Sequence, residues 1–198
     1  MFRDLGYELT RGLAYRKIRH AHQHVYTTLL PFIGAVFFTL AYALAPEKIA
    51  LLGKDGILAS ALSVISTLPG FYFAGLAAVA TFGGVEMDKD IPDPAPELLI
   101  RHRGAMIDTK LSRRKYISYL FSYLVFVSFL LCVSILILNG MQPSILAWKV
   151  AALSWMWGNL ICMGSELLVV FSLMLMASSL TVATLQGLFF LSERIHQP

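Results

Sequence analysis

Long stretches without a charged side chain run through most of this chain of 198 residues. Three of them extend over Val25 to Pro46, Gly56 to Val85 and Tyr116 to Trp148. Each supplies the ~20 apolar residues that a helix needs to cross a ~30 Å hydrocarbon layer. Only 14% of the residues are charged, against the ~25% that are typical of soluble domains. The sequence therefore predicts an integral membrane protein and argues against a soluble enzyme.

A fourth apolar stretch is too long to be one span. As a single helix, Ile145 to Leu191 would measure about 70 Å at 1.5 Å per residue, twice what a bilayer needs. Three tryptophans and Lys149 make its first part too polar to lie deep in lipid. We therefore expect residues 145–163 to form an outer interfacial helix or a shallow re-entrant segment. The fourth span would begin near Gly164 and end at Leu191.

The basic residues predict the orientation. With four spans, thirteen of the sixteen Lys and Arg residues fall on one side of the membrane. The positive-inside rule makes that side cytoplasmic and places both termini there. The predicted fold class is thus an all-α membrane protein with four transmembrane helices. Its parts are an amphipathic cytoplasmic segment (1–24), the first two spans (25–83), a cytoplasmic loop (84–115), the last two spans (116–191) and a cytoplasmic tail (192–198).

The loop is the only substantial polar segment between spans. Three prolines at every second position, ending at Pro96, forbid a helix. The two short runs that follow, separated by Gly104, indicate a small β-hairpin. Ser112 has the position and side chain of an N-cap for the third span.

The N-terminal segment alternates apolar and basic residues, so we expect a helix that lies on the cytoplasmic membrane surface and continues into the first span. On such a helix His20 and His24 share one face. They are either a solvated, lipid-facing cluster or a metal or proton sensor. Two histidines without a third ligand do not predict a metal site. The two cysteines lie inside apolar runs and predict no disulfide.

The second span combines a helix breaker with small residues. Pro69 and Gly70 lie in mid-run, where proline removes a helical hydrogen bond and should kink the helix. The spacing of Gly70, Ala74 and Ala78 is typical of closely packed transmembrane helices. Two interpretations stay open: tight packing alone, or a gating hinge at Pro69 and Gly70.

Glu166 is the only ionisable side chain within the last long apolar stretch. A charge at such a place is costly unless it faces water, a partner or a pore. Polar residues continue along the same helix every seven positions, which aligns them on one stripe. Either they let helices pack closely, or they line an oligomeric pore whose mouth carries a ring of carboxylates. The candidate pore residues are Ser165, Glu166, Ser172, Ser179 and Gln186.

Motifs for catalysis are absent from the sequence. It contains no glycine-rich phosphate loop, no nucleophile elbow and no His-Glu-x-x-His. Acid–base chemistry needs a positioned pair of groups, and the spacing offers Glu166 no partner in the membrane. We therefore expect no enzymatic activity, no cofactor and no metal.

Three segments carry a resemblance to known proteins: Leu68 to Phe82, Pro92 to Pro96, and Leu111 to Leu120. In them the chain resembles small four-span membrane proteins of bacterial accessory genomes. It also looks like the membrane effectors of anti-phage defence operons, among them the channel component of the Hailong system. The resemblance implies an oligomeric channel held closed by the nucleic-acid product of a neighbouring nucleotidyltransferase and opened during infection to depolarise the cell.

The sequence analysis thus predicts a homo-oligomeric ion channel of the bacterial inner membrane, gated from the cytoplasmic side; a tetramer is one option. An anionic nucleotide or oligonucleotide is a candidate regulator. The candidate anion-binding residues are Arg101, Arg103, Arg113, Arg114 and Lys115. The alternative is a non-conducting anchor or scaffold that binds a cytosolic partner protein through residues 84–115.

Overall fold

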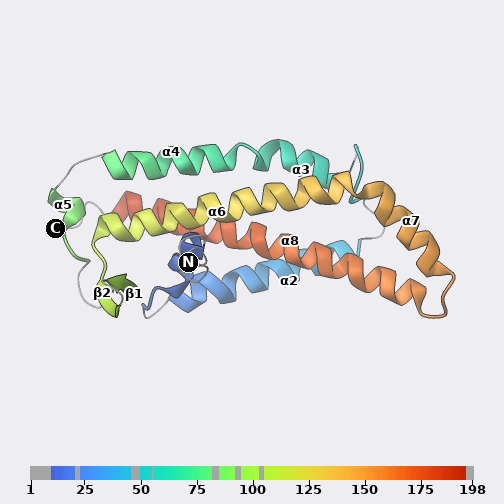
Figure 1. Cartoon of the computed structure of the whole chain (residues 1–198), viewed down its shortest axis with the longest axis horizontal. Helices are drawn as coiled ribbons and strands as arrows, with labels where there is room; N and C mark the ends of the chain where they lie inside the picture. Colours follow the sequence, from blue (N-terminus) through green and yellow to red (C-terminus); the bar gives the residue numbers. More distant parts are fainter. Residues whose placement is uncertain are drawn as a thin grey trace.

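A computed structural model shows a mostly helical protein (Figure 1). It describes residues 10–20, 23–45, 50–54, 56–81, 85–91, 95–102 and 105–194. The elements are a 3-10 helix η1 (Thr10–Lys17), a π-helical turn η2 (Val25–Leu29), α2 (Leu30–Ala43), α3 (Ile57–Ile65), α4 (Leu68–Thr81), α5 (Val85–Asp88), β1 (Glu97–His102), β2 (Ala105–Lys110), α6 (Arg113–Gly140), α7 (Gln142–Leu153), α8 (Gly158–Phe189) and a π-helical turn η3 (Phe190–Arg194).

Four helical segments are long and apolar enough to cross a membrane, as the uncharged runs predicted. They are Val25–Ala43, Ile57–Thr81, Arg113–Gly140 and Gly158–Ser192. They lie side by side in a row, in which α3 and α4 pack on α6, α6 packs on α8, and α8 packs on α2 (Figure 1). The α6 segment is the most buried of the four. In its apolar stretch 44% of the residues are buried, against 6% in the α3–α4 segment. The two outer helices of the row therefore leave most of their surface uncovered.

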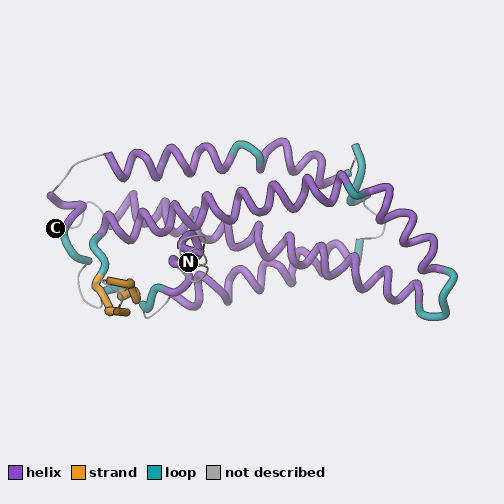
Figure 2. The backbone as a smooth tube through the Cα atoms, viewed as in Figure 1, coloured by secondary structure: helices purple, strands orange, loops and turns teal. Residues whose placement is uncertain are grey.

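The predicted hairpin is confirmed. Strands β1 and β2 pair antiparallel, with Leu98 opposite Thr109 and Ile100 opposite Ile107. Leu98 is buried and joins the core formed by α6 and η1. The hairpin lies at the end of the row opposite α7 (Figure 2). We call these two ends of the molecule the hairpin end and the α7 end.

The N-cap prediction is also confirmed. Ser112 has extended backbone, and its hydroxyl accepts a hydrogen bond from the Lys115 amide at 3.5 Å. The cap satisfies one of the amides that the first turn of a helix leaves unpaired. From this point α6 runs for 28 residues without interruption.

The N-terminal segment differs from the prediction. Helix η1 ends at Lys17, and Arg19 then pairs with Glu97 of β1 through two backbone hydrogen bonds. The expectation of a helix that continues into the first span was therefore wrong. The reason is Tyr15, which is 1% exposed and packs against Tyr116 and Tyr123 of α6. Burial of this ring holds η1 against α6, and the chain must turn before the first span.

Proline divides the second span where the sequence placed a kink. Helix α3 ends at Ile65, Ser66 and Thr67 form a turn, and α4 begins at Leu68. Pro69 has no amide hydrogen to donate to the carbonyl of Ile65. The thiol of Cys132 on α6 donates to this carbonyl instead, at 3.5 Å.

The close approach of α4 to α6 uses a different glycine from the one that the small-residue spacing suggested. Gly70 and Ala74 are exposed. A Cβ atom on Gly75, by contrast, would lie 2.5 Å from Cε1 of Phe121. The Phe121 ring fills the space above Gly75 because that residue has no side chain.

The fourth span begins earlier than predicted. Helix α8 starts at Gly158, and α7 packs against its first part. Together they form a helical hairpin that extends beyond the ends of α2 and α3 (Figure 1). The turn between them is tight, since a Cβ on Gly158 would lie 1.7 Å from the carbonyl oxygen of Ala152. This glycine allows the chain to reverse six residues before the predicted start at Gly164.

The Gly75–Phe121 contact predicts that alanine destabilises the protein at position 75 but not at an open glycine position. Gly75→Ala should lower the free energy of unfolding by about 1–3 kcal/mol, because the added methyl group overpacks the α4–α6 contact. Gly164→Ala is the matched control, since nothing lies within 4 Å of a Cβ at that exposed position. Thermal unfolding of both variants in detergent checks this. Equal midpoints would show that the α4–α6 distance adjusts freely.

Candidate functional site

The predicted polar stripe on α8 divides into two parts with different surroundings. Near the hairpin end, Ser179 is buried and shares a hydrogen bond with the Tyr123 hydroxyl. Seven residues further along α8, Gln186 lies between the hydroxyls of Tyr15 and Tyr116. These two members of the stripe therefore face η1 and α6 within the protomer.

The contacts of Gln186 join three elements of the fold. Its Oε1 accepts from the Tyr15 hydroxyl, and its Nε2 donates to the Tyr116 hydroxyl at 3.0 Å. The ring centroids of Tyr15 and Tyr123 lie 5.3 Å apart. Burial, reinforced by Tyr116, raises the pKa of Tyr15, so its hydroxyl stays a neutral donor. We call Tyr15, Tyr116, Tyr123, Ser179 and Gln186 the tyrosine cluster.

Near the α7 end, Glu166 has partners that sequence spacing did not find. Its Oε1 accepts from the Tyr42 hydroxyl of α2 at 2.6 Å, and its Oε2 pairs with Lys149 Nζ of α7 at 2.5 Å. About a third of each charged side chain is exposed. Lys149 therefore compensates the carboxylate within the protomer, which reduces the attraction that a ring of these groups would exert on cations.

The remaining members of the stripe bond to their own helix. Ser165 donates to the carbonyl of Cys162, and Ser172 donates to that of Leu168. Ser172 is exposed and Ser165 is half-buried. Pore lining by the fourth span stays a prediction, for which Ser172 is the best-placed residue.

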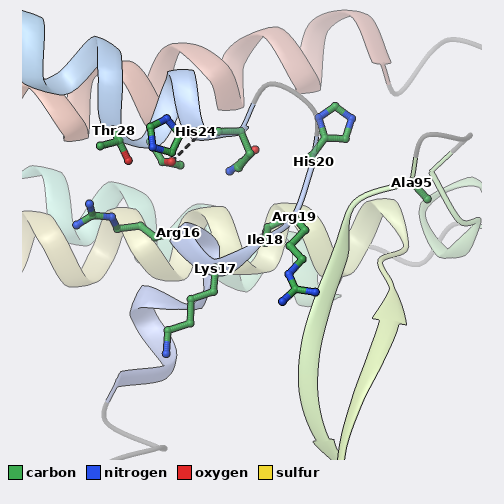
Figure 3. Close-up of a pocket in the computed structure, with 10 residues that line it drawn as sticks. Arg16, Lys17, Ile18, Arg19, His20, His24, Thr28 and Ala95 are labelled. Carbon is green, nitrogen blue, oxygen red and sulfur yellow. Dashed lines mark hydrogen bonds between the residues drawn. The ribbon is translucent and has the colours of Figure 1, made fainter.

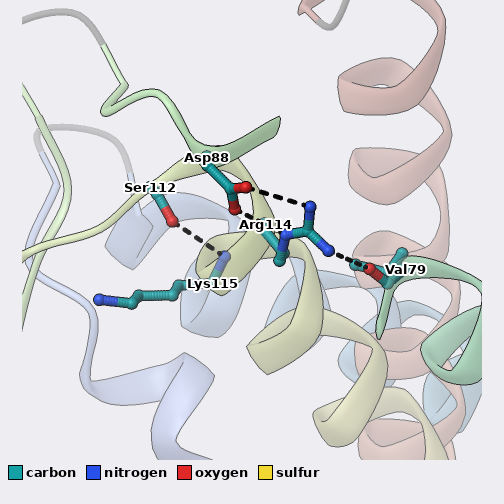
Figure 4. Close-up of polar contacts among 5 residues, drawn as sticks. All are labelled: Val79, Asp88, Ser112, Arg114 and Lys115. Carbon is teal, nitrogen blue, oxygen red and sulfur yellow. Dashed lines mark hydrogen bonds and ion pairs between the residues drawn. The ribbon is translucent and has the colours of Figure 1, made fainter. Parts of the chain in front are cut away.

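The predicted anion-binding residues do not form one site in the part of the chain that the structure describes. Arg103 and the side chain of Arg101 lie outside it. Arg113 is buried, and Arg114 is engaged by Asp88 at 2.7 Å and by the carbonyl of Val79 at 3.3 Å (Figure 4). The Lys115 side chain extends away from these contacts (Figure 4). Arg114 therefore ties the end of α4 and α5 to the start of α6.

An exposed stripe on the second span was missed by the sequence analysis. It consists of small or hydroxyl-bearing residues spaced alternately by three and four. Its members are Ser60, Ser63, Thr67, Gly70, Ala74, Ala77 and Thr81, all of them exposed. This spacing aligns side chains along one side of a helix. The pattern is readable in the sequence, but only the fold shows that this side faces away from α6. We call it the α3–α4 stripe; it includes Gly70 of the predicted hinge, next to Pro69.

Metal binding finds no support in the described ranges. No group of three His, Cys, Asp or Glu side chains is placed there to hold a metal ion.

The Lys149–Glu166 pair predicts a measurable coupling. A double-mutant cycle with Lys149→Met and Glu166→Gln should give a coupling free energy of about 1 kcal/mol, since the pair is only partly shielded from solvent. Thermal or denaturant unfolding in detergent measures it. A parallel cycle with Lys54→Met, an exposed lysine, should give no coupling. A zero value for Lys149 would leave Glu166 uncompensated and restore the carboxylate-ring prediction.

Comparison with known proteins adds no family to these observations. No protein-family model, curated protein or solved structure matches the chain. The resemblance to four-span defence effectors stays a prediction. The case for a function therefore rests on the residues and contacts of the chain itself.

Proposed function

We propose that this chain is the subunit of a homo-oligomeric ion channel of the bacterial inner membrane. Its hairpin end would face the cytoplasm, as the basic residues predict. One observation carries the proposal: the α3–α4 stripe is exposed along the whole second span and has no partner helix in the described protomer. The role in anti-phage defence follows from the resemblance alone.

Both outer helices of the row expose large apolar side chains, but they differ in whether small residues also form an exposed line. Helix α2 exposes large apolar groups, with Phe32, Phe37 and Phe38 each more than half exposed. Such a surface suits lipid chains. The second span also exposes Val64, Phe71 and Phe73. Along the α3–α4 stripe, however, it exposes hydroxyls, glycine and alanine in one continuous line. Small and hydroxyl-bearing residues are enriched where membrane helices meet other helices. The contrast favours a protomer with α2 toward lipid and α3–α4 toward other copies of the chain.

The chemistry of the stripe suits a path for small ions. The hydroxyls of Ser63, Thr67 and Thr81 donate to carbonyls of their own helix at 2.7, 2.8 and 3.0 Å. Their donors are thus satisfied, while their oxygen lone pairs face outward and can replace water around a passing cation. Several copies arranged about one axis would line a pore with these oxygens.

Gating from the hairpin end has a physical route in this fold. The guanidinium of Arg114 bonds the Val79 carbonyl near the end of α4 and also pairs with Asp88 of α5. A displacement of α5 or of the loop at this end would therefore pull on α4. The break before Pro69 lets α4 move without bending α3. We infer that Pro69 and Gly70 act as the hinge of this movement.

Ion flux through the purified chain tests the channel. The chain reconstituted into liposomes should release an entrapped ion, and the oligomer should persist in detergent. A monomer in detergent, together with no flux under any ligand condition, would overturn the channel. That result would favour the alternative, a scaffold that binds a cytosolic partner through residues 84–115.

Cysteine scanning tests which helix lines the path. In a background where the buried Cys132 and Cys162 are alanine, Ser63→Cys and Ala74→Cys should lose most of their flux when a charged thiol reagent is added, because the label would block the pore. Phe38→Cys on α2 is the control and should keep its flux. If Ser172→Cys is blocked while Ser63→Cys is not, the fourth span lines the pore and the α3–α4 assignment is wrong.

A further inference from the structure

A basic pocket of about 610 Å³ lies at the hairpin end of the molecule, outside the residues predicted to bind anions. Figure 3 shows that its side chains come from three places: η1 and the segment after it, the start of the first span, and the loop before β1. Among the residues that the structure describes, no acidic side chain lines the pocket. The residues that carry its chemistry are Arg16, Lys17, Arg19, His20, Gln23 and His24.

Two sets of contacts fix the positions of the basic residues in this pocket. Tyr15 is buried against α6, so its neighbours Arg16 and Lys17 are left on the exposed side of η1. Arg19 is held by its two backbone hydrogen bonds to Glu97, at 2.9 and 3.1 Å. The positions of these cations therefore depend on tertiary contacts of the backbone and of Tyr15, and ion pairing is not what holds them.

The three cations lack counter-charges in the part of the protein that the structure describes. No ion pair or side-chain hydrogen bond involves Arg16, Lys17 or Arg19 within the described ranges. Like charges gathered at one place repel each other, and a bound anion would relieve that repulsion. Arginine is well suited to phosphate because its planar fork can donate two parallel hydrogen bonds.

A buried donor in the same pocket gives an independent indication of a ligand. Gln23 is 4% exposed, and its Nε2 has no hydrogen-bond partner among the described residues. A buried donor without a hydrogen bond destabilises the folded protein. The backbone carbonyl of Gln23 accepts a hydrogen bond from Thr27 Oγ1 at 2.9 Å, which fixes the start of the first span beside the pocket. The Gln23 side chain lies near the Tyr15 hydroxyl and partly offsets the rise in its pKa, but Nε2 makes no hydrogen bond to it. This amide nitrogen can therefore donate to an oxygen of a ligand.

We propose that this pocket binds a phosphate group. Arg16, Lys17 and Arg19 would supply the positive charge, and Gln23 Nε2 would donate to a phosphate oxygen. The pocket is larger than one phosphate requires, so it also has room for the group that carries it. Tyr26 and Leu29, the sequence neighbours of the lining residues Thr27 and Thr28, are exposed. The phosphate is therefore that of a lipid headgroup or of a soluble ligand. The site does not depend on whether the chain conducts ions.

Ligand-induced stabilisation of the full chain tests the site. One arm compares unfolding midpoints in nanodiscs of phosphatidylglycerol and of phosphatidylcholine. The other arm adds inorganic pyrophosphate to the chain in detergent. A rise of several degrees in the first arm identifies a lipid headgroup, and a rise in the second identifies a soluble phosphate. No rise in either arm would overturn the proposal.

Substitutions assign the effect to this pocket. The double variant Arg16→Gln/Lys17→Gln should weaken binding about tenfold or more. Lys54→Gln is the control: Lys54 is an exposed lysine that does not line the pocket. It should respond as the wild type does. An unchanged response of the double variant, or a lost response of the control, would place the anion elsewhere.

Gln23→Met keeps the test decisive if the double variant does not fold. Removing the unpaired donor should raise the midpoint without ligand and reduce the shift caused by ligand. A variant that keeps the full ligand shift would show that Gln23 donates to no ligand oxygen.

Discussion

The packing of α4, α8 and η1 on α6 is the set of contacts on which the rest of the structure depends. Helix α4 approaches one side of it at Gly75, α8 packs on the other side, and η1 lies against its first half. Because hydrocarbon gives no hydrophobic drive for helices to associate, such helices are held by close packing and hydrogen bonds. The glycine contact with Phe121, the Cys132 thiol on the Ile65 carbonyl and the tyrosine cluster supply both. Helix α2 packs on α8, which in turn packs on α6.

Two groups of polar side chains inside the row form hydrogen bonds with one another. The tyrosine cluster lies toward the hairpin end, and the hydrogen-bonded group of Glu166, Tyr42 and Lys149 lies toward the α7 end. Each group ties together elements that are distant in sequence. Each also removes from the α8 stripe residues that would otherwise be free to face a pore. Among the described residues, the α3–α4 stripe and the basic pocket are two polar surfaces that this internal pairing leaves available.

The α3–α4 stripe and the basic pocket lie on different elements. Contacts of Arg114 and of Arg19 join both of them to the hairpin end of the molecule. Arg114 joins α6 to α4 and α5, and the backbone of Arg19 joins the pocket segment to β1. The hairpin follows α5 in the chain and leads directly into α6. A phosphate bound at the pocket and a movement of α4 would therefore act on neighbouring parts of one end of the protein.

The sequence by itself determined the four apolar helices, the break at Pro69, the hairpin and the Ser112 cap, because each follows from local properties: the absence of charge, a missing amide hydrogen, or the spacing of apolar residues. Only the tertiary structure decided which side of each helix is covered. Periodicity places Ser179 and Ser172 on one stripe, yet Ser179 meets Tyr123 and Ser172 is exposed. Likewise, Lys149 is seventeen residues from Glu166 and reaches it because Gly158 permits the chain to reverse. Helical spacing cannot predict such contacts, since they depend on how separate elements pack against each other.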